Sequence, residues 1–83
     1  MKLEIFTIYD AKAESYTTPF FQPKFGIAER LFSDEVNNPE SNLHKHPEDY
    51  TLFNIGTFDQ DTGIVDPLPT PKPISKAIEV KHD

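Results

Sequence analysis

Residues 2–9, Lys-Leu-Glu-Ile-Phe-Thr-Ile-Tyr, decide the fold of this chain, because no other stretch predicts a strand so strongly. The segment is rich in β-branched and aromatic residues and contains neither Gly nor Pro, which is typical of a β-strand. Apolar side chains alternate onto both faces of it: Leu3, Ile5 and Tyr9 on one, Phe6 and Ile8 on the other. Since both faces need cover, the strand is predicted to lie inside a sheet.

A second strand is predicted over residues 50–58, Tyr-Thr-Leu-Phe-Asn-Ile-Gly-Thr-Phe, where apolar residues again fall on both faces. We expect it to pair with strand 2–9, since both look central. Residues 59–63, Asp-Gln-Asp-Thr-Gly, predict a turn, with Gly63 suited to a left-handed backbone. Ile64 and Val65 would then begin the return strand of a hairpin.

Between these strands, residues 11–22 read as a connector and residues 23–37 have helical periodicity. Pro23 suits the first helical position, and Asn37-Asn38-Pro39 ends the pattern. The apolar residues form one predicted stripe that packs across the sheet: Phe25, Ala28, Leu31, Phe32 and Val36.

The composition changes at residue 66, since residues 67–73, Pro-Leu-Pro-Thr-Pro-Lys-Pro, have proline at every second position. Proline lacks the backbone donor that a sheet needs, so this stretch predicts a stiff polyproline-like arm. Residues 74–83 could be a short helix or an edge strand. The expected architecture is α+β: a small antiparallel sheet of about three to four strands with one packed helix in a core domain, residues 1–65, and a proline-rich C-terminal arm, residues 66–83.

Length and composition exclude several classes of protein. The chain has 83 residues, a net charge of −6 and no cysteine, so we expect one small domain without a disulfide framework, thiolate zinc site or broad basic surface. No apolar run reaches the roughly 20 residues that span a bilayer, which predicts a soluble, intracellular protein with no membrane partner. Seven Phe and three Tyr must supply much of the core, and a homodimer would cover part of this aromatic surface.

Two short motifs invite a catalytic or metal-binding interpretation. Residues 61–63, Asp-Thr-Gly, match the triplet of aspartic proteases and faintly resemble a calcium loop, but their context favours a hairpin turn. His44 and His46, with Glu48 or Asp49, could meet a metal on an extended segment. An ordered turn leading into the next strand is favoured, with Pro47 fixing the backbone. We therefore expect no enzyme activity, no cofactor and no metal site.

A nucleic-acid interface requires aromatic rings beside a few cations. The first half of the chain offers seven such residues: Lys2, Lys12, Lys24, Arg30, Tyr16, Phe20 and Phe21. On residue physics alone, a core role for these aromatics is favoured over base stacking. Lys72, Lys76 and Lys81 add a second, weaker basic group in the tail.

The order of these features resembles the small nonstructural, DNA-binding protein of gokushovirus-type microviruses, which are single-stranded-DNA phages. The resemblance rests on the start Met-Lys-Leu-x-Ile-x-Thr-Ile-Tyr-Asp-x-Lys-Ala, on residues 19–21, Pro-Phe-Phe, and on the helix core of residues 28–37. Its most specific piece is the block of residues 46–50, His-Pro-Glu-Asp-Tyr. It covers residues 1 to 65 and implies a phage protein made in the host bacterial cytoplasm, without catalysis.

The function expected from the resemblance is binding of single-stranded DNA during replication or genome packaging. A charge of −6 imposes a condition on it, because scattered acids would repel phosphates. The cations must be sorted onto one face or summed across a homodimer. The alternative is a protein–protein interaction or structural accessory, in which the proline-rich arm and a dimer interface dock a capsid or replication protein.

Overall fold

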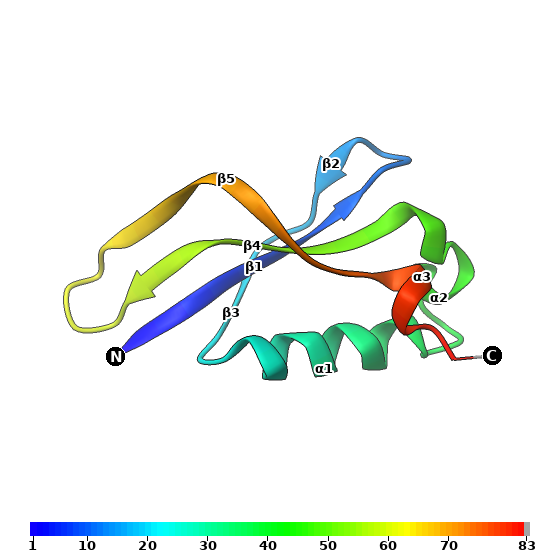
Figure 1. The fold of residues 1–83 in the computed structure, drawn as a ribbon, viewed down its shortest axis with the longest axis horizontal. Coiled ribbons are helices and arrows are strands. Elements are labelled where there is room, and N and C mark those ends of the chain that lie inside the picture. The colour runs from blue at the N-terminus through cyan, green and yellow to red at the C-terminus, as the bar shows by residue number, and fades with distance from the viewer. Residues whose placement is uncertain (83) are drawn as a thin grey trace.

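The computed structural model describes residues 1–82, in which a twisted antiparallel sheet of five strands lies over one main helix (Figure 1). The predicted α+β class is confirmed. The elements, in chain order, are β1 (Lys2–Asp10), β2 (Ser15–Tyr16), β3 (Phe20–Gln22), α1 (Phe25–Val36), α2 (Asn42–Lys45), the 3₁₀ helix η1 (Pro47–Asp49), β4 (Tyr50–Asp59), β5 (Val65–Lys76) and α3 (Ala77–Val80).

The two strongest predicted strands are the two central strands of the sheet. The strand order is β2-β1-β4-β5, with β3 also paired to β1, and every pairing is antiparallel. β1 and β4 pair along their whole lengths, from Lys2 opposite Asp59 to Asp10 opposite Tyr50, as expected. The sheet has more strands than predicted because β2 and β3 span only two and three residues, too few to show a period.

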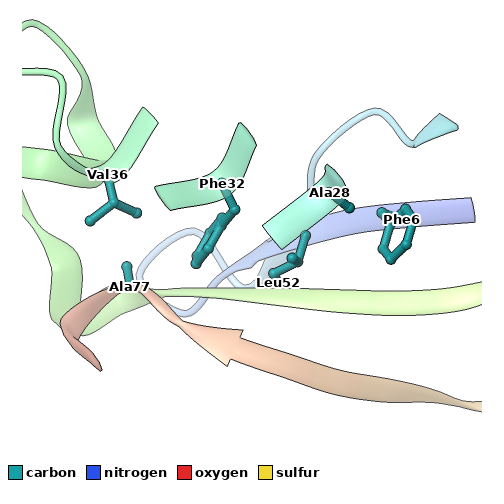
Figure 2. Close-up of a cluster of buried hydrophobic side chains, with 6 residues drawn as sticks. All are labelled: Phe6, Ala28, Phe32, Val36, Leu52 and Ala77. Atoms are coloured by element: carbon teal, nitrogen blue, oxygen red, sulfur yellow. The ribbon is translucent and has the colours of Figure 1, made fainter. Parts of the chain in front are cut away.

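The core lies between α1 and one face of the sheet (Figure 2). The predicted helical stripe is confirmed at Ala28, Phe32 and Val36, which are buried, but Leu31 is 45% exposed. Because Leu31 precedes Phe32 by one residue, it lies about 100° around the helix and points away from the sheet. The buried cluster consists of Phe6, Ala28, Phe32, Val36, Leu52 and Ala77.

The predicted C-terminal arm is not what the structure shows. Residues 65–76 form β5 along the edge of the sheet, and residues 77–80 form the short helix α3. Proline is tolerated in an edge strand, where its missing N–H can face solvent. A period of two places the missing donors along one side of the strand, so the same pattern that predicted an arm is compatible with an edge.

A bulge in β4 interrupts its pairing with β1. Phe6 lies opposite Asn54 and Ile5 opposite Gly56, so Ile55 has no partner on β1. The buried Asn54 amide donates a 3.0 Å hydrogen bond to the Ile5 carbonyl, which satisfies a polar group at the irregularity. Gly56 approaches β5 closely here, because a Cβ atom at this residue would lie 2.5 Å from the Asp66 carbonyl oxygen.

The predicted turn at residues 59–63 is confirmed, with Gly63 at a φ of 74°. The Asp61 N–H donates a 2.9 Å hydrogen bond to the Asp59 carboxylate. This bond is the main reason that the pKa of Asp59 lies below its ordinary value of 3.8.

We expect acid to weaken this turn. A lowered carboxyl pKa stabilises the folded state above the unfolded pKa, and that contribution is lost as the pH falls through the folded pKa. An NMR titration should show Asp59 titrating below the ordinary aspartate value of 3.8. In the Asp59→Asn variant, the part of the stability that the wild type loses through protonation of Asp59 should be absent. An Asp59 pKa at or above 3.8 would contradict this account.

Candidate nucleic-acid interface

The sheet has a second broad face, on the side away from α1 (Figure 1). We call it the open face and define it by the odd-numbered residues of β1, Leu3, Ile5, Thr7 and Tyr9, together with the residues paired opposite them. Directly opposite residues of an antiparallel pair point to the same side, so the register assigns each side chain to a face. Of these positions, Val65, Tyr16 and Phe21 are 53%, 48% and 44% exposed.

One row of the open face crosses four strands and holds aromatic and cationic side chains. Lys76 pairs with Thr51, Thr51 with Tyr9, and Tyr9 with Tyr16. In the next row, Phe53 pairs with Thr7. The two rows therefore bring residues from β1, β2, β4 and β5 to one part of the face.

Three of these rings form a cluster, which we call the aromatic triad: Tyr9, Tyr16 and Phe53. The ring centroids are 4.7 Å apart for Tyr9 and Tyr16, 5.7 Å for Tyr16 and Phe53, and 6.4 Å for Tyr9 and Phe53. Tyr9 and Phe53 are half-buried, so they support the exposed Tyr16 ring from below. The triad gives an unpaired base an aromatic surface to stack on.

The strand that carries Tyr16 is held by its neighbour Thr17. The Thr7 hydroxyl donates a 2.7 Å hydrogen bond to the Thr17 carbonyl, and the Ile8 N–H donates a 3.1 Å bond to the Thr17 hydroxyl. On the other side of β2, the N–H groups of Lys12 and Ala13 donate to the Asp10 carboxylate and fix the connecting turn. Tyr16 is thus placed by bonds on both sides of a two-residue strand.

A hollow of about 270 Å³ opens beside Tyr16 on this face. Residues 68–71 of β5, which include Pro71 of its lining, have no paired residue on β4. Thr17 and Thr7 supply its few polar atoms. Its lining is Thr7, Tyr16, Thr17, Pro19, Ile55 and Pro71.

The fold sorts the charges of the strands by face. Asp59 pairs with Lys2, Asp66 with Thr57, and both pairs lie on the α1 side of the sheet. Within residues 1–82, the paired positions of the open face contain no Asp or Glu, and the acids of the strands fall on the opposite side: Glu4, Asp10, Asp59 and Asp66. The strand acids are thus separated from the row of Lys76, but Glu79 of α3 lines a hollow together with Thr51 and Lys76.

The predicted interface residues are not brought together. Lys12 and Tyr16 lie in the same β1–β2 hairpin, and Phe21 lies on the open face at its far end, paired with Ile5. Phe20 packs against the core, with its ring 5.7 Å from that of Phe6, and offers no free stacking surface. Three cations are elsewhere: Lys2 on the α1 side of β1, Lys24 at the exposed residue that precedes α1, and Arg30 at an exposed position of α1.

The residues chosen from the sequence left out Tyr9 and Phe53, and Lys76 was given only as part of a weaker basic group in the tail. Alternate residues of a strand share a face, so the positions of Tyr9 and Phe53 in their predicted strands already indicated the face on which each side chain lies. The residue type of Lys76 was noted, but no local pattern could place it beside Tyr9, because its position depends on the pairing of β5 with β4. That strand was predicted as an arm.

The block of residues 46–50 forms the predicted ordered turn, with a buried Pro47 starting η1. The ligand atoms of His46, Glu48 and Asp49 lie within 4.8 Å of one another, but this group is largely exposed, and such groups are common without an ion. His44 is not part of it, since its Nδ1 lies 3.1 Å from the Val36 carbonyl oxygen. Burial, together with the nearby Asp10 charge, raises the pKa of Tyr50 at the base of the turn.

No helix within residues 1–82 is long and apolar enough to cross a bilayer. Comparison with solved structures finds no match. Residues 3–80 match the family described as Phage ORF5 protein. The chain is also 39% identical, over 67 residues, to Protein ORF5 of Chlamydia phage 1, an alignment that covers 76% of this chain and 70% of that relative. The resemblance to small proteins of gokushovirus-type microviruses is confirmed, and the chain belongs to the Phage ORF5 protein family.

Proposed function

We propose that this phage protein is a non-enzymatic accessory that binds single-stranded DNA on the open face, in the cytoplasm of the host bacterium, during replication or genome packaging. The observation that carries the proposal is the aromatic triad, which lies on a part of the sheet without carboxylates and has Lys76 in the same row. Lys12 lies in the adjoining turn.

The chemistry of the face favours a single strand over a duplex. Unpaired bases expose their ring faces and can stack on Tyr16, whereas the bases of a duplex are already stacked on one another. Each stacked base contributes about 1 to 3 kcal/mol. Lys12 and Lys76, both exposed, are available to the phosphates at the edges of the triad.

The net charge of −6 is compatible with this mode of binding because salt screens exposed charges, so that only nearby charges act strongly on a phosphate. Exposed charges farther apart than the Debye length, about 10 Å at 0.1 M salt, interact weakly. The distant acids on the α1 side therefore act less on a bound phosphate than the two lysines do, whereas Asp10 near Lys12 and Glu79 near Lys76 oppose the lysines directly. With about two phosphates neutralised, the logarithm of the affinity should fall with the logarithm of salt with a slope of about −1.4.

The proposal is tested by titrating labelled oligonucleotide with wild-type protein and two pairs of variants at low salt. Tyr16→Ala should weaken binding roughly 5- to 150-fold through loss of stacking. Leu31→Ala, at a residue of similar exposure on α1, should leave the affinity unchanged. Lys76→Gln should lower, by about 0.7, the magnitude of the slope of log affinity against log salt concentration. Lys24→Gln, at a residue on the α1 side, should leave this slope unchanged.

Three results would contradict the proposal. These are no binding at micromolar protein, an affinity that does not weaken as salt rises, and equal effects of Lys76→Gln and Lys24→Gln. A duplex that binds as well as the single strand would exclude stacking as the mechanism.

A second candidate function is favoured by the hollow beside Tyr16, which could seat an apolar side chain of a capsid or replication protein. Under this alternative, Tyr16→Ala abolishes recovery of a phage protein in a pull-down while the oligonucleotide titration shows no binding to the wild type. The same variant therefore separates the two functions.

A further inference from the structure

We infer that the hollow beside Tyr16 takes the C5 methyl group of one thymine base, so that the site prefers thymine among the bases of a single strand. The inference rests on the proposed function and names the base that the site selects. Tyr16 belongs both to the aromatic triad and to the lining of the hollow. A base that stacks on the exposed Tyr16 ring therefore lies next to the hollow.

The bulge in β4 supplies an apolar side chain to the hollow. Among residues 50–59, Ile55 alone has a paired residue on neither β1 nor β5. Bulges commonly redirect a side chain, and Ile55 lines the hollow together with Thr7 and Tyr16 of the open face. Pro71 adds a ring from the segment of β5 that is unpaired with β4. The hollow thus has rigid apolar walls.

The polar groups of the lining are already engaged within the protein. The Thr7 hydroxyl donates to the Thr17 carbonyl at 2.7 Å, and the Thr17 hydroxyl accepts the Ile8 N–H at 3.1 Å. The lining contains no charged residue, and its two prolines, Pro19 and Pro71, have no N–H to donate. A polar group that entered the hollow would lose water and gain few partners, which is unfavourable.

These properties select the thymine methyl group. Of the four bases of DNA, thymine alone carries an apolar substituent, the C5 methyl group, and apolar side chains are its usual contacts in proteins. The hollow measures about 270 Å³. This is slightly below the range of about 300 to 1,000 Å³ that drug-sized ligands occupy, so the hollow suits the edge of one base rather than a whole nucleotide.

The surroundings of the hollow favour a base over a side chain of another protein. The hollow is continuous with the aromatic triad through Tyr16, and Lys76 lies in the row of Tyr9 and Tyr16. A thymine with its methyl group in the hollow keeps its sugar and phosphate outside, on the side where Lys76 and Lys12 are exposed. An apolar side chain of a protein would make no use of the two lysines.

The test compares two labelled strands of about 6 nucleotides, one of thymidine and one of deoxyuridine, which differ only in the C5 methyl group. The wild type should bind the thymidine strand about fourfold more tightly, the effect of burying one group of this size. Ile55→Ala should lower this ratio to less than about twofold, because the methyl group loses its contact. Ile27→Ala, at a 37% exposed residue of α1, is the control and should keep the wild-type ratio.

The Ile55 variant also separates burial of the methyl group from stacking. A methyl group that only strengthened stacking on Tyr16 would give Ile55→Ala the same ratio as the wild type, and this result overturns the inference. If circular dichroism shows that Ile55→Ala is unfolded, Pro71→Ala takes its place, with Pro69→Ala as the control. Both prolines are exposed and lie in the unpaired segment of β5, but Pro71 lines the hollow and Pro69 does not.

The outcomes keep the two proposals apart. Equal affinities of the wild type for the two strands overturn the inference alone and leave the proposed function standing. Binding of neither strand contradicts the proposed function, and the inference falls with it. In that case, loss of a phage protein from the pull-down in Ile55→Ala would assign the hollow to a protein side chain. In the thymidine complex, NMR should show nuclear Overhauser effects between the C5 methyl group and the Ile55 side chain.

Discussion

Replacement of Phe32 by alanine is expected to remove a large part of the stability of the protein. The Phe32 side chain is 1% exposed and lies in the middle of the buried cluster between α1 and the sheet (Figure 2). Truncation of such a side chain costs about 3 to 5 kcal/mol, the lost burial plus the cavity left behind. Domains of this size are stabilised by roughly 0.05 to 0.15 kcal/mol per residue, so a substantial unfolded population should follow.

Thermal unfolding followed by circular dichroism measures this effect. Phe32→Ala should lower the Tm by roughly 4 to 8 °C for each kcal/mol lost. Leu31→Ala is the matched control, because Leu31 is the neighbouring residue of the same helix but is 45% exposed. Its Tm should change little. Equal losses at residues 31 and 32 would mean that α1 packs on the sheet with a different face.

Gly56→Ala is expected to have the second large effect, since it acts on the attachment of β5. The added Cβ would lie 2.5 Å from the Asp66 carbonyl oxygen and 2.9 Å from the Pro67 Cα, at a residue with a φ of 156°. Both contacts are with backbone, so no side-chain rotation can relieve them, and β5 must move away from β4. Strained backbone and overpacking each cost about 1 to 3 kcal/mol, which predicts a loss of about 2 to 4 kcal/mol.

Urea unfolding compares this variant with Gly26→Ala. A Cβ at Gly26 meets nothing within 4 Å, and alanine is the better residue inside a helix, so Gly26→Ala should stabilise the protein by about 0.5 to 1 kcal/mol. The two glycine variants should therefore move the urea midpoint in opposite directions. A Gly56→Ala protein as stable as the wild type would show that β5 is not held against β4 at this point.

Much of the fold could be predicted from the local pattern of the sequence. Two-residue alternation identified β1 and β4 and their central position, and helical periodicity identified α1. The prediction was wrong at Leu31 because this residue lies about 100° around the helix from Phe32, outside the stripe of Ala28, Phe32 and Val36 that is buried against the sheet. It was wrong for β5 because the absence of proline donors was taken to exclude pairing, whereas an edge strand requires donors on one side only.

The candidate site was harder to predict than the fold. Tyr16 and Lys12 were chosen for their residue types and do lie together in one hairpin. Phe20, also chosen for its type, belongs to the core, and its neighbour Phe21 faces outward. Composition cannot distinguish two adjacent phenylalanines. Their opposite roles follow from the pairing of β3 with β1, which turns successive side chains to opposite faces.

The sequence by itself determined the family, the central pair of strands, the helix and the hairpin turn, because each of these depends on residues close together in the chain. It also determined the net charge of −6. Only the tertiary structure decided where that charge lies. The register of four strands places the strand acids on the α1 side and leaves Tyr9, Tyr16, Phe53 and Lys76 on the other. Register depends on contacts between residues distant in the chain, which no local pattern specifies.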